Sequence, residues 1–141
     1  RSTPKPSSAA SDVYKRQPAE RVAIDFGWTE VDYRWNGSGW TRRQGGTAHI
    51  DSNGVRVAPP NMIVQFVRYG TSPAAETSPE AETVGTGVAW IFTDGHLIIG
   101  EWDRTDSSLP ALYHVDGEEI RLTPGRTWVA LAEEGTASWE E

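Results

Sequence analysis

The chain has 141 residues, enough for one domain and little more. Its formal net charge of −7 argues against general nucleic-acid binding through phosphate contacts, and the absence of cysteine excludes disulfides and cysteine-based metal sites. Tryptophan occurs 7 times, which permits a single core built around large aromatic side chains.

The first 17 residues differ in composition from the rest. They contain both lysines and carry a net charge of +3. Because the whole chain carries −7, residues 18–141 carry −10. Residues 7–17, SSAASDVYKRQ, resemble translated adapter sequence from metagenomic reads. We therefore interpret residues 1–17 as a non-native leader, or as a natural disordered linker. On the first interpretation the chain is a metagenomic fragment, and any signal peptide or lipid anchor would lie upstream.

Four Asx-Gly pairs predict tight turns, because these residues tolerate the positive backbone angles of hairpin loops. The pairs are Asn36-Gly37, Asn53-Gly54, Asp94-Gly95 and Asp116-Gly117. Strand-like sequence surrounds them, in residues 31–35 and 40–44, 88–92 and 97–102, and 111–115 and 119–122. Residues 21–26, 63–69 and 127–131 bring the expected total to about ten short strands. Pro59-Pro60 stops any strand before Asn61.

No segment shows a helical apolar period of useful length. We therefore predict one all-β (or β-rich α+β) domain over residues 18–132, a mostly antiparallel sandwich or barrel. Residues 71–83, TSPAAETSPEAET, are predicted to form an exposed acidic loop, and residues 133–141 an acidic tail from which Trp139 could dock on the domain. No apolar run approaches the roughly 20 residues that cross a bilayer.

His49 and Asp51 lie two apart in a strand-like segment, so both side chains could face the same way. A carboxylate beside an imidazole can make it a general base, and the pair could supply two metal ligands. Alternatively, Asp51 closes its own Asp-Ser-Asn-Gly turn, the commoner outcome for so short a motif. The sequence has neither His-x-His nor HExxH spacing, so it supports a metal site only weakly and indicates no cofactor.

An aromatic and cationic hairpin spans residues 34–43, with Arg34, Trp35, Trp40, Arg42 and Arg43. Exposed tryptophan faces stack on sugar rings, and arginine holds carboxylate or phosphate in a bidentate fork. We therefore name Trp40 and Arg42 as candidate binding residues for a glycan or an anionic ligand. The alternative is that one tryptophan is core and that the arginines pair with Asp32 and Glu30 on neighbouring strands.

Residues 100–104, GEWDR, alternate within a predicted strand. Trp102 and Arg104 share one face and are further binding candidates, while Glu101 and Asp103 share the other. Two carboxylates on one face invite a glycosidase interpretation, but exposed acids on a sheet are usually solvated surface. The sequence contains no phosphate-cradling glycine loop and no GxSxG.

The order of these motifs resembles a known family. The order runs through Arg42, a Gly-Gly step, His49-x-Asp51, Asn61-Met-Ile-Val-Gln-Phe-Val, Gly85-x-Gly87, Gly100-x-Trp102-x-Arg104 and Leu122-x-Pro-Gly-x-Thr-Trp128. Over about residues 21–132 it resembles the C-terminal domain of the DUF3048 family, the YerB-like bacterial lipoproteins. The resemblance implies a secreted or lipid-anchored protein with an N-terminal domain that is missing here. It also maps the family's recurrent polar positions onto Arg42, His49, Asp51 and Asn61.

We therefore expect an extracytoplasmic, non-catalytic module that binds a cell-wall glycan, a peptide or an envelope protein together with the missing N-terminal domain. The alternative is an enzyme whose active site lies at the junction with that domain. Arg42 would then hold an anionic group, and His49, beside Asp51, would move a proton. Convergence of Arg42, His49, Asp51 and Asn61 in one cleft would favour a site. Burial of His49, with Asp51 capping its own turn, would count against one.

Overall fold

Strands make up all the regular structure that the chain forms. The computed structural model describes residues 14–72 and 75–141, and only the backbone of 70–72 and 75–80. These residues contain fourteen strands and no helix, and twelve of the strands form two mostly antiparallel sheets that pack face to face. The prediction of an all-β sandwich is therefore confirmed.

The larger sheet has seven strands in the order β12-β11-β10-β9-β6-β13, with β1 paired to β10. Its strands are β1 (Gln17–Pro18), β6 (Asn61–Phe66), β9 (Gly85–Thr93), β10 (His96–Arg104), β11 (Leu112–Val115), β12 (Glu118–Glu119) and β13 (Thr127–Ala132). All pairs are antiparallel except β6 and β13, which run parallel. This parallel pair requires a long crossover, supplied here by the intervening hairpins.

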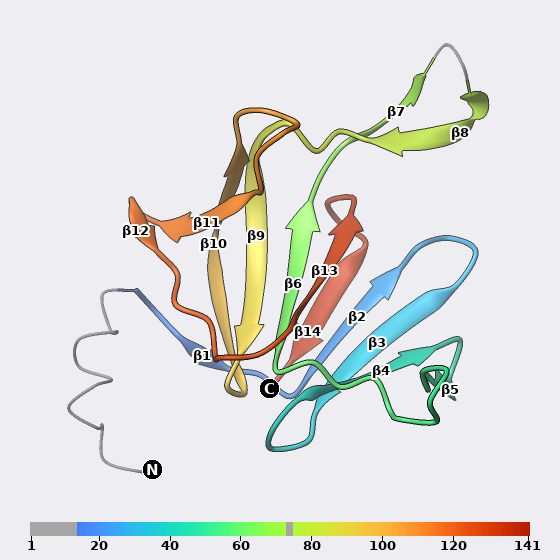
Figure 1. Ribbon diagram of the computed structural model, residues 1–141, viewed down its shortest axis with the longest axis vertical. Coiled ribbons are helices and arrows are strands. Elements are labelled where there is room, and N and C mark those ends of the chain that lie inside the picture. The colour runs from blue at the N-terminus through green and yellow to red at the C-terminus, as the bar shows by residue number, and fades with distance from the viewer. Residues whose placement is uncertain (1–13, 73–74) are drawn as a thin grey trace.

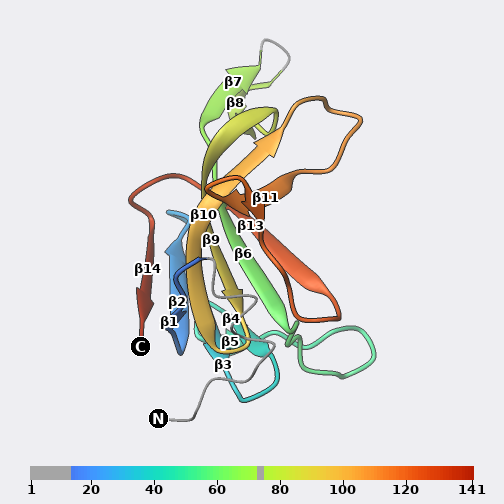
Figure 2. The ribbon, with the colours of Figure 1, turned by 90° about the vertical axis from the view of Figure 1, so that its left-hand side faces the viewer.

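The smaller sheet has five strands in the order β14-β2-β3-β4-β5. Its strands are β2 (Arg21–Asp25), β3 (Glu30–Trp35), β4 (Trp40–Gln44), β5 (Thr47–Ala48) and β14 (Ala137–Glu140). Figures 1 and 2 show the two sheets as separate layers, with β14 beside β2 although the two lie at opposite ends of the sequence. A third hairpin, β7 (Tyr69–Ser72) and β8 (Ala75–Ala81), projects from one end of the sandwich.

Two apolar clusters cover the two faces of the larger sheet. The cluster between the sheets contains Val22, Ile24, Tyr33, Trp40, Met62, Val64 and Phe92. The cluster on the outer face contains Ile63, Ile91, Ile98, Trp102 and Ile120. Neighbouring residues of β6 point to opposite faces, and all six are buried, because the strand is covered on both faces.

Two of the four predicted Asx-Gly turns are two-residue hairpin loops. Asp94 and Asp116 have φ values of 51° and 49°, each followed by a glycine with positive φ, so each pair makes a two-residue hairpin loop. Asn36-Gly37 instead begins a four-residue loop, because Trp35 pairs with Trp40 and the Asn36 side chain accepts hydrogen bonds from the backbone of residues 38 and 39.

Three segments differ from their expected structure. Residues 71–83, predicted as a loop, contribute most of hairpin β7–β8, and the predicted tail contains β14, which pairs with β2. Residues 1–13 of the predicted leader lie outside the described residues, but Tyr14 is buried in the outer cluster and Gln17–Pro18 pair with β10. Strand pairing and one aromatic anchor override the polar composition of these segments.

In the described part of the chain, no helix has the length and apolar character needed to span a bilayer.

Candidate functional site

Arg42 lies on the inward side of β4, where it contacts residues from three separate segments. Its Nε donates a hydrogen bond to the Tyr33 hydroxyl at 3.1 Å, and its Nη1 donates to Gln44 Oε1 at 3.2 Å and to His49 Nδ1 at 2.8 Å. The guanidinium carbon stands 4.8 Å from the centre of the Trp128 ring. We call Arg42, Tyr33, Gln44, His49 and Trp128 the Arg42 cluster.

The hydrogen bond from Arg42 determines which imidazole nitrogen of His49 carries the proton. A guanidinium can only donate, so His49 Nδ1 is the acceptor and the imidazole carries its proton on Nε2. The His49 ring also meets the Trp128 ring edge to face, with the centroids 5.9 Å apart. His49 therefore presents Nε2–H as a hydrogen-bond donor beside a permanent positive charge, an arrangement that suits an anionic ligand.

Tyr33 holds the Arg42 side chain in position through its hydroxyl. Burial raises the pKa of the Tyr33 hydroxyl, and the hydrogen bond and positive charge of Arg42 act in the opposite direction. Tyr33 thus stays neutral and accepts the Arg42 Nε–H. The bond holds the guanidinium against the rings, so its position is set before any ligand arrives.

Charge pairing distinguishes Arg42 from its neighbours. The Asp32 carboxylate is buried, at 4% exposure, and meets Arg21, Arg34 and Arg43 at 3.1 to 3.5 Å. The expectation that arginines of this hairpin pair with Asp32 therefore holds for Arg34 and Arg43. Among the ion pairs of the described residues, Arg42 appears in none, and its side-chain acceptors are all neutral.

Asp51 does not join His49. Its Oδ1 accepts hydrogen bonds from the backbone N–H of Asn53 at 2.8 Å and of Val55 at 3.0 Å. The carboxylate thus closes the turn that contains Asn53-Gly54, as the alternative interpretation of the sequence anticipated. Only Arg42 and His49 of the four recurrent positions lie together.

Asn61 is fully buried and belongs to a different hydrogen-bond network at the start of β6. Its Nδ2 donates to the carbonyl oxygens of Thr123 and Arg126, and its Oδ1 accepts from the Thr123 N–H and the Thr93 hydroxyl. Every bonding position of the amide is used, so Asn61 ties the crossover before β13 to β6 and β9. Its place is structural.

The other three candidate residues also serve the fold. Trp40 has 0% exposure and packs edge to face on Phe92, so it presents no ring to a ligand. Trp102 is buried, with its Nε1 donating to the Phe66 carbonyl oxygen at 2.8 Å. Arg104 binds the Thr83 hydroxyl and the carbonyl oxygens of Ser107 and Leu109. Burial removes the two tryptophans from solvent, which a strand pattern alone cannot reveal, and Arg104 is only partly buried.

The paired carboxylates of β10 meet a histidine on β11. Asp103 Oδ2 lies 2.9 Å from His114 Nε2, and Glu101 Oε1 lies 3.9 Å from His114 Nδ1. Glu101 and Asp103 therefore share a face, as expected, and form cross-strand contacts with His114. No group of three or more His, Asp or Glu side chains positioned to hold a metal occurs among the residues that the structure describes.

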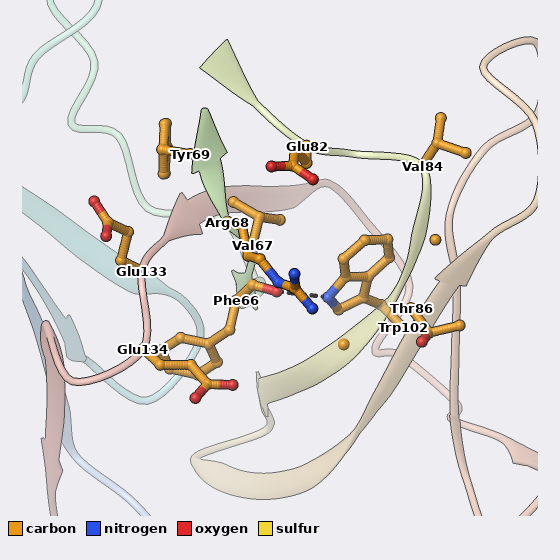
Figure 3. A pocket seen from close by; sticks show the side chains of 12 residues that line it. Phe66, Val67, Arg68, Tyr69, Glu82, Val84, Thr86, Trp102, Glu133 and Glu134 are labelled. Atoms are coloured by element: carbon orange, nitrogen blue, oxygen red, sulfur yellow. Dashed lines mark hydrogen bonds between the residues drawn. The ribbon is translucent and has the colours of Figure 1, made fainter. Parts of the chain in front are cut away.

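A second feature lies at the end of the sandwich from which hairpin β7–β8 projects. Two adjoining grooves, of about 830 and 570 Å³, share Tyr69 and Glu133. Figure 3 shows Arg68, Glu82, Glu133, Glu134 and Tyr69 around the larger one, with the Trp102–Phe66 hydrogen bond at its base. The smaller groove contains Trp28, which is 79% exposed. Sequence reasoning missed these residues, although a Gly-Trp pair in a polar turn was a visible signal.

Comparison with known proteins gives one family and one solved structure. The model of the family described as "Protein of unknown function (DUF3048) C-terminal domain" matches residues 22–129. The crystal structure of YerB from Bacillus subtilis is similar in fold, with a TM-score of 0.78 and 19% sequence identity. The alignment covers 91% of this chain and 46% of the YerB chain, so the chain spans less than half of that protein's length. No curated protein matches in sequence.

Proposed function

Because this chain belongs to the DUF3048 C-terminal domain family, we propose that it is a non-catalytic binding module whose Arg42 cluster holds a carboxylate group of a cell-wall glycan or peptide. One observation carries the proposal. Arg42 is held in place by neutral groups alone, in a chain whose other arginines on the same hairpin share a carboxylate. A guanidinium without a carboxylate partner, half-buried against aromatic rings, favours an anion supplied from outside.

The carboxylate would meet two kinds of donor. The Arg42 guanidinium supplies charge and the His49 Nε2–H supplies a neutral hydrogen bond. Trp128, which is partly exposed, lies beside both and offers an apolar surface to the rest of the ligand. Such a combination of one cation, one donor and one ring is typical of sites that bind acidic sugars and peptide carboxylates.

Catalysis is the second candidate, and the geometry favours it less. A general base needs a free nitrogen lone pair, but His49 Nδ1 already accepts from Arg42 and its Nε2 carries the proton. Asp51, the group expected to orient His49, is occupied by its own turn. Proton transfer by His49 would first require loss of the Arg42 contact.

The setting of the module is part of the proposal. We place it outside the cytoplasm, in a membrane-anchored or secreted protein, acting together with an N-terminal domain. Two facts support the N-terminal domain: the family description names a C-terminal domain, and the chain aligns with less than half of the YerB chain.

Calorimetric titration of the protein tests the Arg42 cluster. The ligands are a muramic-acid disaccharide, N-acetyl-dialanine, and the methyl ester of each. We expect at least one free acid to bind and its ester to bind roughly tenfold more weakly or not at all, because the ester carries no charge. The two acids distinguish a glycan source from a peptide source.

Two variants assign the binding to the cluster. Arg42→Ala should weaken binding by about tenfold or more, whereas Arg121→Ala, an exposed arginine outside the cluster, should leave it unchanged. Equal binding of acid and ester, or an unchanged affinity in Arg42→Ala, would contradict the proposal. Turnover of a probe that His49→Ala abolishes would establish the enzymatic alternative.

A further inference from the structure

The most exposed large apolar side chain of the described residues lies outside the Arg42 cluster. Trp28 sits in the loop between β2 and β3, is 79% exposed, and lines the smaller groove with Phe26 and Tyr69. Gly27, with φ of 89°, forms the turn that presents it, and the Asp25 carboxylate accepts the Gly27 N–H at 2.8 Å. The loop is thus closed by its own hydrogen bond and holds a tryptophan in solvent.

Tyr69 joins the two grooves into one surface, since it lines both. Its hydroxyl donates to the Leu131 carbonyl oxygen at 2.8 Å, which fixes the ring at the end of β13. Burial raises the pKa of Tyr69, and the negative charge of Glu133 raises it further. The Glu133 carboxylate therefore acts on the same ring that the ligand would contact.

The charges around this surface are mostly negative. Its ionisable lining consists of Asp25, Glu82, Glu133 and Glu134 against Arg68 alone. Figure 3 shows Glu133 and Glu134 on the side of Arg68 away from Trp102. Aromatic faces flanked by carboxylates attract organic cations, through the ring quadrupole and through direct charge.

We propose that this aromatic and acidic groove binds an amine-bearing peptide segment, with the ammonium of a lysine-type side chain over Trp28 or Tyr69 and beside Glu133. The peptide backbone would follow the shared rim formed by Tyr69 and Glu133. Charge complementarity selects this occupant over an acidic peptide, because four carboxylates face one arginine. The site is independent of the Arg42 cluster, which lies near the opposite end of β13.

Titration with trilysine, monitored by tryptophan fluorescence, tests the groove. We expect trilysine to bind and its side-chain-acetylated counterpart to bind at least tenfold more weakly, since acetylation removes the cation. Trp28→Ala should weaken trilysine binding by about tenfold by calorimetry, and Glu133→Gln by roughly threefold to tenfold. Binding should weaken as salt rises, because the carboxylates are exposed.

Matched variants guard against a general charge effect. Glu118→Gln removes an exposed carboxylate from β12, outside the groove, and should leave the affinity unchanged. Equal binding of acetylated and free trilysine, tighter binding of neutral chitotriose, or equal losses in Glu118→Gln and Glu133→Gln would each overturn the proposal. So would the absence of trilysine binding. Arg42→Ala should not affect this titration, so failure here is separate from failure of the Arg42 cluster.

Discussion

Adjacent arginines on one hairpin have different partners. Arg34 and Arg43 point to the outer face and share the buried Asp32 carboxylate, whereas Arg42 points inward to neutral groups and rings. The difference follows from the alternation of side chains along a strand, which places residues 41–44 on two faces in turn. The same alternation thus places two arginines beside a shared carboxylate and leaves Arg42 outside every ion pair of the described residues.

At the same scale, Asn61 should behave as a structural residue. Asn61→Ala removes the side-chain hydrogen bonds to the Thr123 N–H, the Thr123 carbonyl oxygen and the Thr93 hydroxyl, so the free energy of unfolding should fall by about 3 kcal/mol. Urea denaturation measures the loss. Asn53→Ala, at an exposed turn position, is the control and should change stability by less than about 0.5 kcal/mol. A stable Asn61→Ala protein with weakened ligand binding would instead place Asn61 in a site.

At Gly87, the addition of a single methyl group should also lower the stability of the fold. A Cβ at this position would lie 2.5 Å from Trp102 Nε1 and 2.8 Å from the Phe66 carbonyl oxygen, so Gly87→Ala should break the hydrogen bond between them. We expect a loss of about 1–3 kcal/mol in the free energy of unfolding. Thermal denaturation of Gly87→Ala beside Thr86→Ala, an exposed neighbour, measures it. Equal melting temperatures would show that the strand can shift without cost.

Among the elements, hairpins were predictable and distant pairings were not. Asp94-Gly95 and Asp116-Gly117 carry their turn chemistry in two residues, and the structure shows the expected positive φ values. Strand β14 carries no such signal. Its pairing with β2 joins residues 137–140 to residues 21–24, and the polar sequence of β14 matches an edge strand as well as a tail.

In the candidate site, too, contacts within one short stretch were predictable and contacts with distant strands were not. Arg42 and His49 come from one short stretch, and their approach could be anticipated from it. Trp128 arrives from β13, which reaches the cluster through parallel pairing with β6, so its place depended on topology. Asp51 was ambiguous in sequence, because a carboxylate before Asn-Gly can serve a neighbour or its own turn, and the nearby backbone N–H groups prevail.

Strand β14 provides a prediction at the scale of elements. Trp139 is partly buried against the core cluster between the sheets, so Trp139→Ala should lower the free energy of unfolding by about 1–2 kcal/mol. Ser138→Ala, its exposed neighbour, should have little effect. Guanidinium denaturation of the two variants measures the difference. If both match the parent chain, β14 does not contribute to the stability of the sandwich.

At the scale of the whole molecule, three tyrosines link stability to alkaline pH. Burial raises the pKa of Tyr33, Tyr69 and Tyr113 above the usual value. The fold therefore favours the neutral phenols. Below a pH of about 10 neither state is ionised, and above it the unfolded chain loses its protons first.

The contribution of the three tyrosines to the free energy of unfolding should consequently be constant up to a pH of about 9.5. It should fall as the pH rises beyond about 10. Urea denaturation at a series of pH values, with phenolate absorbance followed in parallel, measures both quantities. Replacing Glu133 by Gln should shift the Tyr69 titration to lower pH, because one of the two causes of its raised pKa is removed. Unfolding that begins while all tyrosines remain protonated would assign the loss to other groups.

The two proposed binding surfaces of this domain carry charges of opposite sign. The Arg42 cluster offers a positive charge near the start of β13, and the aromatic and acidic groove offers negative charge beyond its end. A ligand that carries both a carboxylate and an amine could contact the module at either site. The two sites must therefore be separated by experiment.

The most direct measurement is an NMR titration of the protein with whichever free acid binds, the muramic-acid disaccharide or N-acetyl-dialanine, followed at the Arg42 Nε–H, the His49 imidazole and the Trp128 indole. The account predicts saturable shifts at these three groups, loss of all of them in Arg42→Ala, and no shift at the Trp28 indole. Shifts confined to Trp28, or no shift at Arg42 and His49 while the acid binds, would contradict the claim that Arg42 holds the carboxylate.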